Sequence, residues 1–140
     1  MTKKYEILGK YIKDLSSETR DVQTYLFVKE HIGKYQLNID INSKALKNKL
    51  IEICTTFKFE DKEPNELKSY FEINFATIIK PADEIKEKKD LEKIVLCDVP
   101  NSVVSDIEKS FTDMMQNSGF SNIKLEKKID FTKLYLEKFN

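Results

Sequence analysis

The sequence predicts a single α+β domain over residues 1–140, with a four-stranded antiparallel sheet followed by a long helix and a short C-terminal helix. Two observations support this prediction. Up to about Lys80, apolar and polar residues mostly alternate, which is typical of strands with one buried and one solvated face. Beyond Lys80 the apolar residues recur at helical spacing. A chain of 140 residues is long enough to bury one core.

Four segments alternate as strands do, namely residues 3–15, 35–41, 51–59 and 67–79. The apolar rows of the first two are predicted to be Tyr5, Ile7, Tyr11 and Leu15, then Tyr35, Leu37, Ile39 and Ile41. The polar segment 60–66, which contains Pro64-Asn65, predicts a turn that joins the third and fourth strands as a hairpin.

Residues 16–34 show neither period, so we expect a long irregular loop that displays Tyr25 and Phe27. Long loops that carry aromatic residues are often functional. The lone histidine, His31, lies in this segment and is expected to be an ordinary surface residue.

Three helices are expected after the strands. The highly charged segment 81–94 opens with Pro81 at a first helical position. Residues 101–119 carry an apolar stripe, Val103, Val104, Ile107, Phe111, Met114 and Met115, which ends at Gly119. The stripe predicts either core packing or contact between copies, and we assign Val103, Ile107, Phe111 and Met114 to an oligomer interface. Residues 129–139 form a last short helix with Asp130 as its N-cap.

The composition argues against several classes of function. Lys+Arg and Asp+Glu number 24 each, so no overall field indicates nucleic acid or an anionic membrane as a partner. No export signal or membrane span is evident, which predicts a cytoplasmic protein. Cys54 and Cys97 are far apart and fit reduced, partly buried thiols. No catalytic pair, metal site or cofactor motif is recognisable, so a binding module is favoured over an enzyme.

Several segments, in order, resemble the SecB family of bacterial protein-export chaperones. They are "YIKDLSSE" (11–18), "YQLNIDIN" (35–42), "FEINFATII" (71–79), "VPNSVVSDIEKSFTDMMQNSGF" (99–120) and "KLEKKIDFTKLYLEKF" (124–139). The resemblance covers about residues 5–139. It implies an ATP-independent chaperone, a homotetramer built as a dimer of dimers, that holds unfolded preproteins and passes them to the SecA motor without any cofactor.

The resemblance also implies which residues act. Clients would bind hydrophobic grooves, and the matching positions are Tyr25, Phe27, Val99, Pro100, Leu134 and Tyr135. SecA would dock on acids of the outer sheet face at Asp14, Glu18 and Glu72, with Tyr70 as an apolar neighbour. Strand alternation agrees with this placement, because it puts Glu72 opposite to Phe71 and Ile73, and Asp14 opposite to Leu15.

The sequence departs from the family pattern in places that concern SecA. Ser105, Asp106, Ile107 and Glu108 replace the family's Pro-Tyr-Ala-Arg, and the acidic tail has no counterpart before Asn140. A divergent SecB-like chaperone for other clients, such as an antitoxin, is therefore the alternative. Two other classes of function are less favoured by the sequence. A small-ligand-binding or catalytic protein would need a closed polar pocket with clustered acids or histidine, which the sequence does not indicate. A purely structural oligomer subunit would not display aromatic residues such as Tyr25 and Phe27 on a loop.

Overall fold

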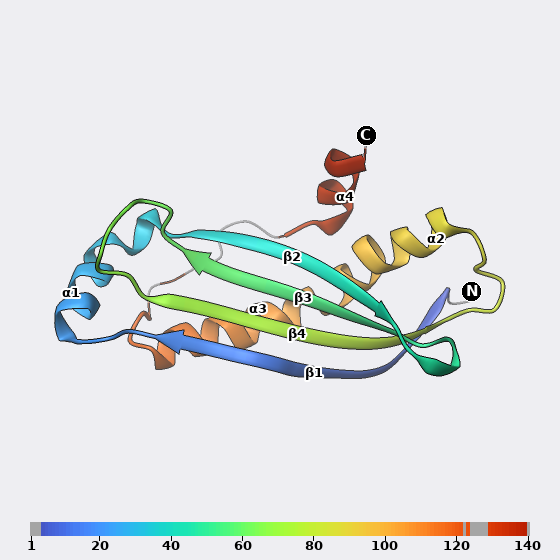
Figure 1. The fold of residues 1–140 in the computed structure, drawn as a ribbon, viewed down its shortest axis with the longest axis horizontal. Helices are drawn as coiled ribbons and strands as arrows, with labels where there is room; N and C mark the ends of the chain where they lie inside the picture. Colours follow the sequence, from blue (N-terminus) through green and yellow to red (C-terminus); the bar gives the residue numbers. More distant parts are fainter. Residues whose placement is uncertain (1–3, 122, 124–128, 140) are drawn as a thin grey trace.

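The computed structural model describes residues 4–121, 123 and 129–139. Its framework is an antiparallel sheet with the strand order β1-β4-β3-β2 (Figure 1). The strands are β1 (Tyr5–Glu18), β2 (Gln36–Ala45), β3 (Ile51–Glu60) and β4 (Tyr70–Pro81). The four-stranded α+β prediction is therefore confirmed, including the hairpin between the third and fourth strands. A short helical turn, η2 (Lys47–Lys49), lies between β2 and β3.

Two irregularities in β1 change which side chains face the core. The pairing of β1 with β4 shifts register between Ile7 and Gly9 and again between Ile12 and Asp14. Each shift is a β-bulge, which moves the following residues to the opposite face. Tyr11 consequently pairs with Ala76 on the outer face, whereas Ile7 lies on the core side. The prediction that Tyr11 shares a face with Tyr5, Ile7 and Leu15 is wrong for this reason.

The segment expected to be a loop contains a helix, α1 (Val22–His31), followed by the short turn η1 (Ile32–Lys34). Asp21 caps the helix, because its Oδ1 accepts hydrogen bonds from the backbone N–H of Thr24 (2.8 Å) and the Thr24 hydroxyl (2.6 Å). These bonds lower the pKa of the Asp21 carboxyl. Thr24 and Val28 are the residues of this helix whose side chains are buried. The helix crosses from the end of β1 to the start of β2 at one end of the molecule (Figure 1).

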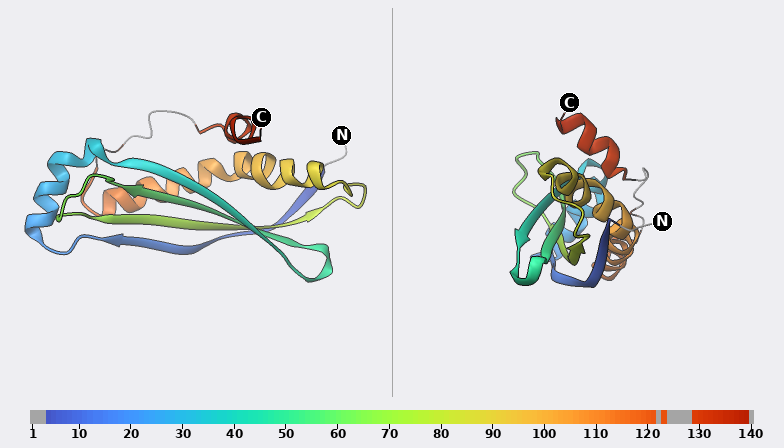
Figure 2. Two further views of the ribbon diagram at one scale, coloured as in Figure 1. Left: turned by 45° about the horizontal axis from the view of Figure 1, so that its top comes forward. Right: turned by 90° about the vertical axis from the view of Figure 1, so that its right-hand side faces the viewer.

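One continuous helical rod, residues 88–117, covers one face of the sheet (Figure 2). It consists of α2 (Lys88–Lys93), a wider π-helical turn η3 (Ile94–Asp98) and α3 (Val99–Asn117). Pro100 explains the wide turn, because it has no N–H to donate one turn back and its ring crowds the carbonyl there. The start of the first helix was mispredicted: Pro81 ends β4 instead, and the helix begins at Lys88.

The apolar stripe of α3 packs on the sheet within the same chain. Phe111 is fully buried, with its ring centroid 5.7 Å from that of Phe59 and 6.4 Å from that of Phe57. Val103 and Ile107 are also fully buried and Met114 is 6% exposed. Their assignment to an oligomer interface is corrected, because side chains already enclosed by their own sheet have no surface left for a second copy. Core packing, the other interpretation of the apolar stripe, accounts for these residues.

The last helix, α4 (Phe131–Phe139), projects from the body of the molecule with its first turn near the rod (Figure 2). Phe131 is 1% exposed and belongs to the main core cluster. The N-cap prediction is confirmed, since Asp130 Oδ1 accepts from the N–H groups of Thr132 (3.0 Å) and Lys133 (3.4 Å). Within the described residues, no helix combines the length and apolar character that a bilayer crossing requires.

Candidate functional site

A groove of about 370 Å³ separates α4 from the edge strand β2. It is lined by Ile39, Asp40 and Ile41 of β2, Leu96 of η3, and Phe131, Leu134, Tyr135 and Glu137 of α4. Leu134 is 44% exposed, and Ile39 and Ile41 are only half-buried. The groove is therefore mainly apolar, with a carboxylate on two of its walls, and it lies beside the edge of β2 that no strand of the described residues pairs.

The structure separates the residues predicted to bind clients. Leu134 and Tyr135 line the groove, and their binding of clients stays a prediction. Val99 and Pro100 lie at the start of α3 but are buried, and Val99 belongs to a second core cluster with Ile53 and Ile79. Pro100 acts on the backbone of the rod rather than offering a surface. These two positions are corrected to structural roles, because neither side chain can reach a ligand.

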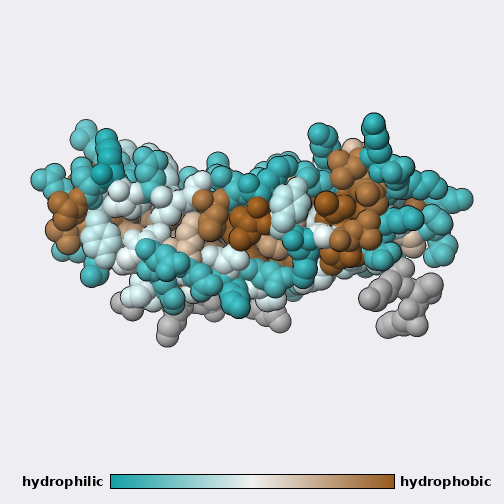
Figure 3. Space-filling view, turned by 90° about the horizontal axis from the view of Figure 1, so that it is seen from below, coloured by the Kyte–Doolittle hydropathy of each residue, from teal (hydrophilic) through white to brown (hydrophobic). Residues whose placement is uncertain are grey.

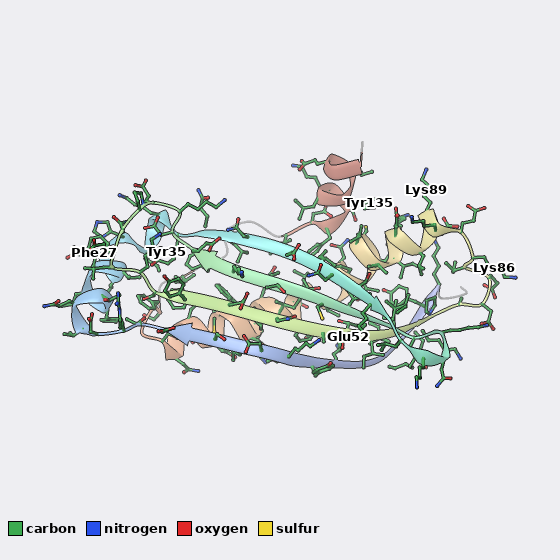
Figure 4. All side chains as sticks on the ribbon, in the orientation of Figure 1. Phe27, Tyr35, Glu52, Lys86, Lys89 and Tyr135 are labelled. Atoms are coloured by element: carbon green, nitrogen blue, oxygen red, sulfur yellow. The ribbon has the colours of Figure 1, made fainter. Side chains whose placement is uncertain are left out.

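Tyr25 and Phe27 lie on α1, at one end of the molecule and away from α4; Figure 4 shows Phe27 there, whereas Tyr135 on α4 lies nearer the middle of the long axis. The Tyr25 hydroxyl donates to the carbonyl of Gly119 at 2.8 Å, and its ring lies 5.3 Å from that of Phe120. Phe27 stacks on the ring of His31 at 4.1 Å. Both aromatic residues are half-buried: Tyr25 fastens α1 to the segment that follows α3, and Phe27 stacks within α1 itself, so neither lies on the irregular loop expected from the sequence.

Asp14, Glu18 and Glu72, here called the acidic strip, share the outer face of the sheet with Tyr70. Glu18 pairs directly with Tyr70, Ser16 with Glu72, and Asp14 with Asn74. Directly paired residues project from the same face, so the placement predicted from strand alternation is confirmed. The strip is not purely acidic, because Lys58 Nζ lies 3.6 Å from Glu72 Oε1. Tyr70 is 61% exposed beside it.

A second polar cluster on the outer face, around Glu52, was not predicted. Glu52 accepts hydrogen bonds from Lys13 Nζ and from the Tyr11 hydroxyl, both at 2.9 Å. These bonds hold the pKa of the Glu52 carboxyl below its usual value. Burial raises the pKa of the neighbouring Cys54 thiol. The bulges in β1 create this cluster, and strand alternation alone could not reveal them.

The free edge of β1 carries exposed apolar side chains. Ile12 and Leu15 pair with Phe75 and Ile73, whose side chains are buried on the core face. They are nevertheless 43% and 47% exposed, because the rod lies over the middle of the sheet and β1 has no further strand beside it. Figure 3 looks onto this side of the molecule and shows several hydrophobic patches along its length. The edge therefore presents both unpaired backbone groups and apolar surface.

Comparison with known proteins agrees with these features. The model of the family described as "Preprotein translocase subunit SecB" matches residues 1–140. The chain belongs to the SecB family. A relative from Pelagibacter ubique (strain HTCC1062), whose provisional name is protein-export protein SecB, is 50% identical over 140 residues, which cover 100% of both chains.

The fold is similar to that of a solved SecB-like chaperone, Rv1957 of Mycobacterium tuberculosis, in complex with a ChAD peptide from the Rv1956 HigA1 antitoxin. The TM-score is 0.62 at 10% identity, with 89% of this chain and 91% of that chain covered. At such low identity the similarity concerns the fold. SecB is a family of chaperones rather than of enzymes, and its members bind unfolded client peptides. Family and fold together support a chaperone that acts in protein export.

The contact of Tyr25 with Gly119 and Phe120, just after α3, can be tested by substitution. Gly119 has φ +96°, and a Cβ there would lie 2.7 Å from a ring carbon of Tyr25. Gly119→Ala should therefore lower the free energy of unfolding by roughly 1–3 kcal/mol through backbone strain and overpacking. Thermal unfolding followed by circular dichroism would measure this loss.

Gly33→Ala is the matched control, because a Cβ at Gly33 would meet nothing within 4 Å. It should leave the melting temperature within about one degree of the unmodified chain, as expected of an unstrained surface change. If Gly119→Ala were equally silent, Tyr25 would not be clamped as described.

Proposed function

We propose that this chain is an ATP-independent holdase that captures unfolded preproteins in the cytoplasm and passes them to SecA. The observation that carries the proposal is the open apolar groove between β2 and α4 in a chain of the SecB family. An extended polypeptide can bury apolar side chains in such a groove without a defined sequence. It can also hydrogen-bond to the free edge of β2, which supplies backbone partners whatever the client sequence.

The name of the 50% identical relative favours export over the antitoxin alternative. The complex of the Mycobacterium tuberculosis chaperone contains an antitoxin peptide, yet its similarity to this chain is limited to the fold. We therefore place an unfolded preprotein in the groove.

Replacing Leu134 by Ser should weaken the binding of an unfolded preprotein about tenfold. The substitution removes an apolar wall of the groove, and one buried leucine side chain is worth about 1.5–3 kcal/mol. Fluorescence anisotropy of a labelled unfolded preprotein, titrated with the chaperone in the absence of nucleotide, would measure the Kd.

Leu136→Ser provides the matched control on the same helix. Leu136 is 50% exposed but does not line the groove, so its replacement should not change the Kd. A third variant, Phe27→Ser, examines the α1 site implied by family resemblance. If Phe27→Ser weakens binding while Leu134→Ser does not, clients bind at α1 and the groove assignment is wrong.

We further propose that the free edge of β1 is covered by a second copy of the chain. An edge strand of 14 residues with exposed apolar side chains invites pairing, and soluble proteins cover or interrupt such edges. Two copies that contact each other through β1 would form a self-complementary dimer about a twofold axis. Two such dimers would make the tetramer expected from the family resemblance.

Replacing both Ile12 and Leu15 by Asp should lower the native mass measured by light scattering or native mass spectrometry. Burying two unpaired carboxylates in an interface is strongly unfavourable. Leu26→Asp is the control. Leu26 is 56% exposed on α1, which lies at one end of the molecule and away from the middle of β1. An unmodified chain that stays monomeric at micromolar concentration would refute the assembly.

The acidic strip is the proposed docking site for a basic element of SecA. Asp14 and Glu18 are exposed on β1 and Glu72 is half-buried on the adjacent β4, and these carboxylates need no catalytic partner for this role. Exposed charges chiefly steer association and set specificity, and salt screens them. Because Lys58 already neutralises part of the field at Glu72, the attraction is expected to be moderate.

Reversing both Asp14 and Glu72 to Lys should slow the binding of SecA and flatten its dependence on salt, without changing client affinity or native mass. Surface plasmon resonance at several salt concentrations would measure the association rate. Asp113→Lys, an exposed reversal on α3, should have little effect. If the double reversal binds SecA with the same rate and salt slope, the strip is only a solvated strand face.

A further inference from the structure

The side-chain amide of Asn101 joins α3 to α4. Its Oδ1 accepts a hydrogen bond from the backbone N–H of Phe131 at 2.9 Å. Its Nδ2 donates to the hydroxyl of Thr132 at 2.9 Å and lies 3.8 Å from the Sγ of Cys97. The orientation of the amide is fixed by chemistry, because a backbone N–H can only donate and must face the oxygen.

Cys97 completes this contact, here called the latch, which consists of Cys97, Asn101, Phe131 and Thr132. The Sγ of Cys97 and the Oγ1 of Thr132 lie 3.0 Å apart and share a hydrogen bond in which either can donate. Cys97 belongs to the wide turn η3 and is 2% exposed. The latch therefore connects η3, α3 and the first turn of α4, and its thiol is enclosed by that connection.

The first turn of α4 depends on this external bond. A helix begins with N–H groups that have no partner within the helix. Asp130 Oδ1 accepts from the N–H groups of Thr132 and Lys133, and among the described residues Asn101 alone accepts from that of Phe131. An N-cap contributed by another helix fixes both the start and the direction of α4.

Beyond that turn the leucine side chains of α4 are exposed. Phe131 is 1% exposed at its start, whereas Leu134 and Leu136 are 44% and 50% exposed further along. Figure 2 shows the helix standing away from the sheet and the rod. The direction in which α4 leaves the latch sets the distance of Leu134 and Tyr135 from Ile39 and Ile41 across the groove, together with the packing of α4 on η3.

We propose that Asn101 is a positioning residue for client capture: through the latch it holds α4 at the angle that forms the groove. This inference rests on the proposed function, because it assigns the groove to unfolded polypeptide. Asn101 itself does not line the groove and is not assigned a contact with the client.

The experiment uses the full-length chain with Cys54→Ser, so that Cys97 is the only thiol. Asn101→Ala removes both bonds of the amide. Asn101→Asp keeps an oxygen acceptor for Phe131, and its charge suits a helix N-terminus. Ser102→Ala is the matched control, since Ser102 is exposed on the same turn and bonds only to the carbonyl of Val99 at 2.8 Å.

Three quantities are measured for each variant: the rate of Cys97 alkylation by a maleimide, the Kd for a labelled unfolded preprotein, and the native mass. Asn101→Ala should accelerate alkylation and weaken the preprotein Kd, each by roughly fivefold, the factor that corresponds to the loss of one helix cap. For Asn101→Asp, the alkylation rate and the preprotein Kd should both lie close to those of the unmodified chain. Ser102→Ala should match the unmodified chain, and native mass should not change.

The outcomes separate the two proposals. Faster alkylation with an unchanged Kd would overturn the inference, because the latch would hold α4 without governing capture. A weaker Kd with unchanged alkylation would also overturn it, since Asn101 would then contact the client directly. If the unmodified chain binds no unfolded preprotein, the proposed function fails, and with it the role of Asn101 in client capture. The alkylation rates then show separately whether the latch holds α4. Should Asn101→Ala fail to fold, Thr132→Val, which removes only the hydroxyl, replaces it.

Discussion

The structure depends on one packing constraint: a single four-stranded sheet must bury its apolar face beneath a single helical rod. Phe111 lies at the centre of this contact, against Phe57 and Phe59, and Val103 and Ile107 continue it along the rod. A buried phenylalanine contributes about 3–5 kcal/mol relative to alanine, a large part of the stability of one domain. Because one rod covers only the middle of the sheet, each long edge keeps apolar surface that the chain itself does not enclose.

The two edges differ in how this surface is exposed. At β2 the short helix α4 stands beside Ile39 and Ile41, which leaves an open groove suited to an extended polypeptide. At β1 no helix or strand of the described residues lies beyond Ile12 and Leu15, so a flat partner such as a second copy fits better than a thin chain. The same incomplete coverage thus leaves room for both the proposed client capture and the proposed assembly, at opposite sides of one sheet.

The route of the helical rod follows from a local backbone effect. Pro100 lacks the N–H that an α-helix needs, and the chain widens into the π-helical turn η3. Wide turns of this kind often occur at functional sites. Here η3 contributes Leu96 to the groove and Cys97 to the contact with α4. Pro100 and Val99 therefore matter to the groove through the geometry of the rod, although their own side chains are buried.

The sequence by itself determined the strands, the long helix and the placement of Asp14, Glu18 and Glu72 on one face, because these follow from a period of two or of 3.6 residues along the chain. Family resemblance added Leu134 and Tyr135, which do line the groove. Tertiary structure alone decided the rest. Bulges in β1 moved Tyr11 and Lys13 to Glu52, the Asp21 cap made a helix of an expected loop, and the sheet enclosed Val103 and Phe111. Periodicity shows which side chains share a face, but which faces become covered depends on contacts between segments far apart in the chain.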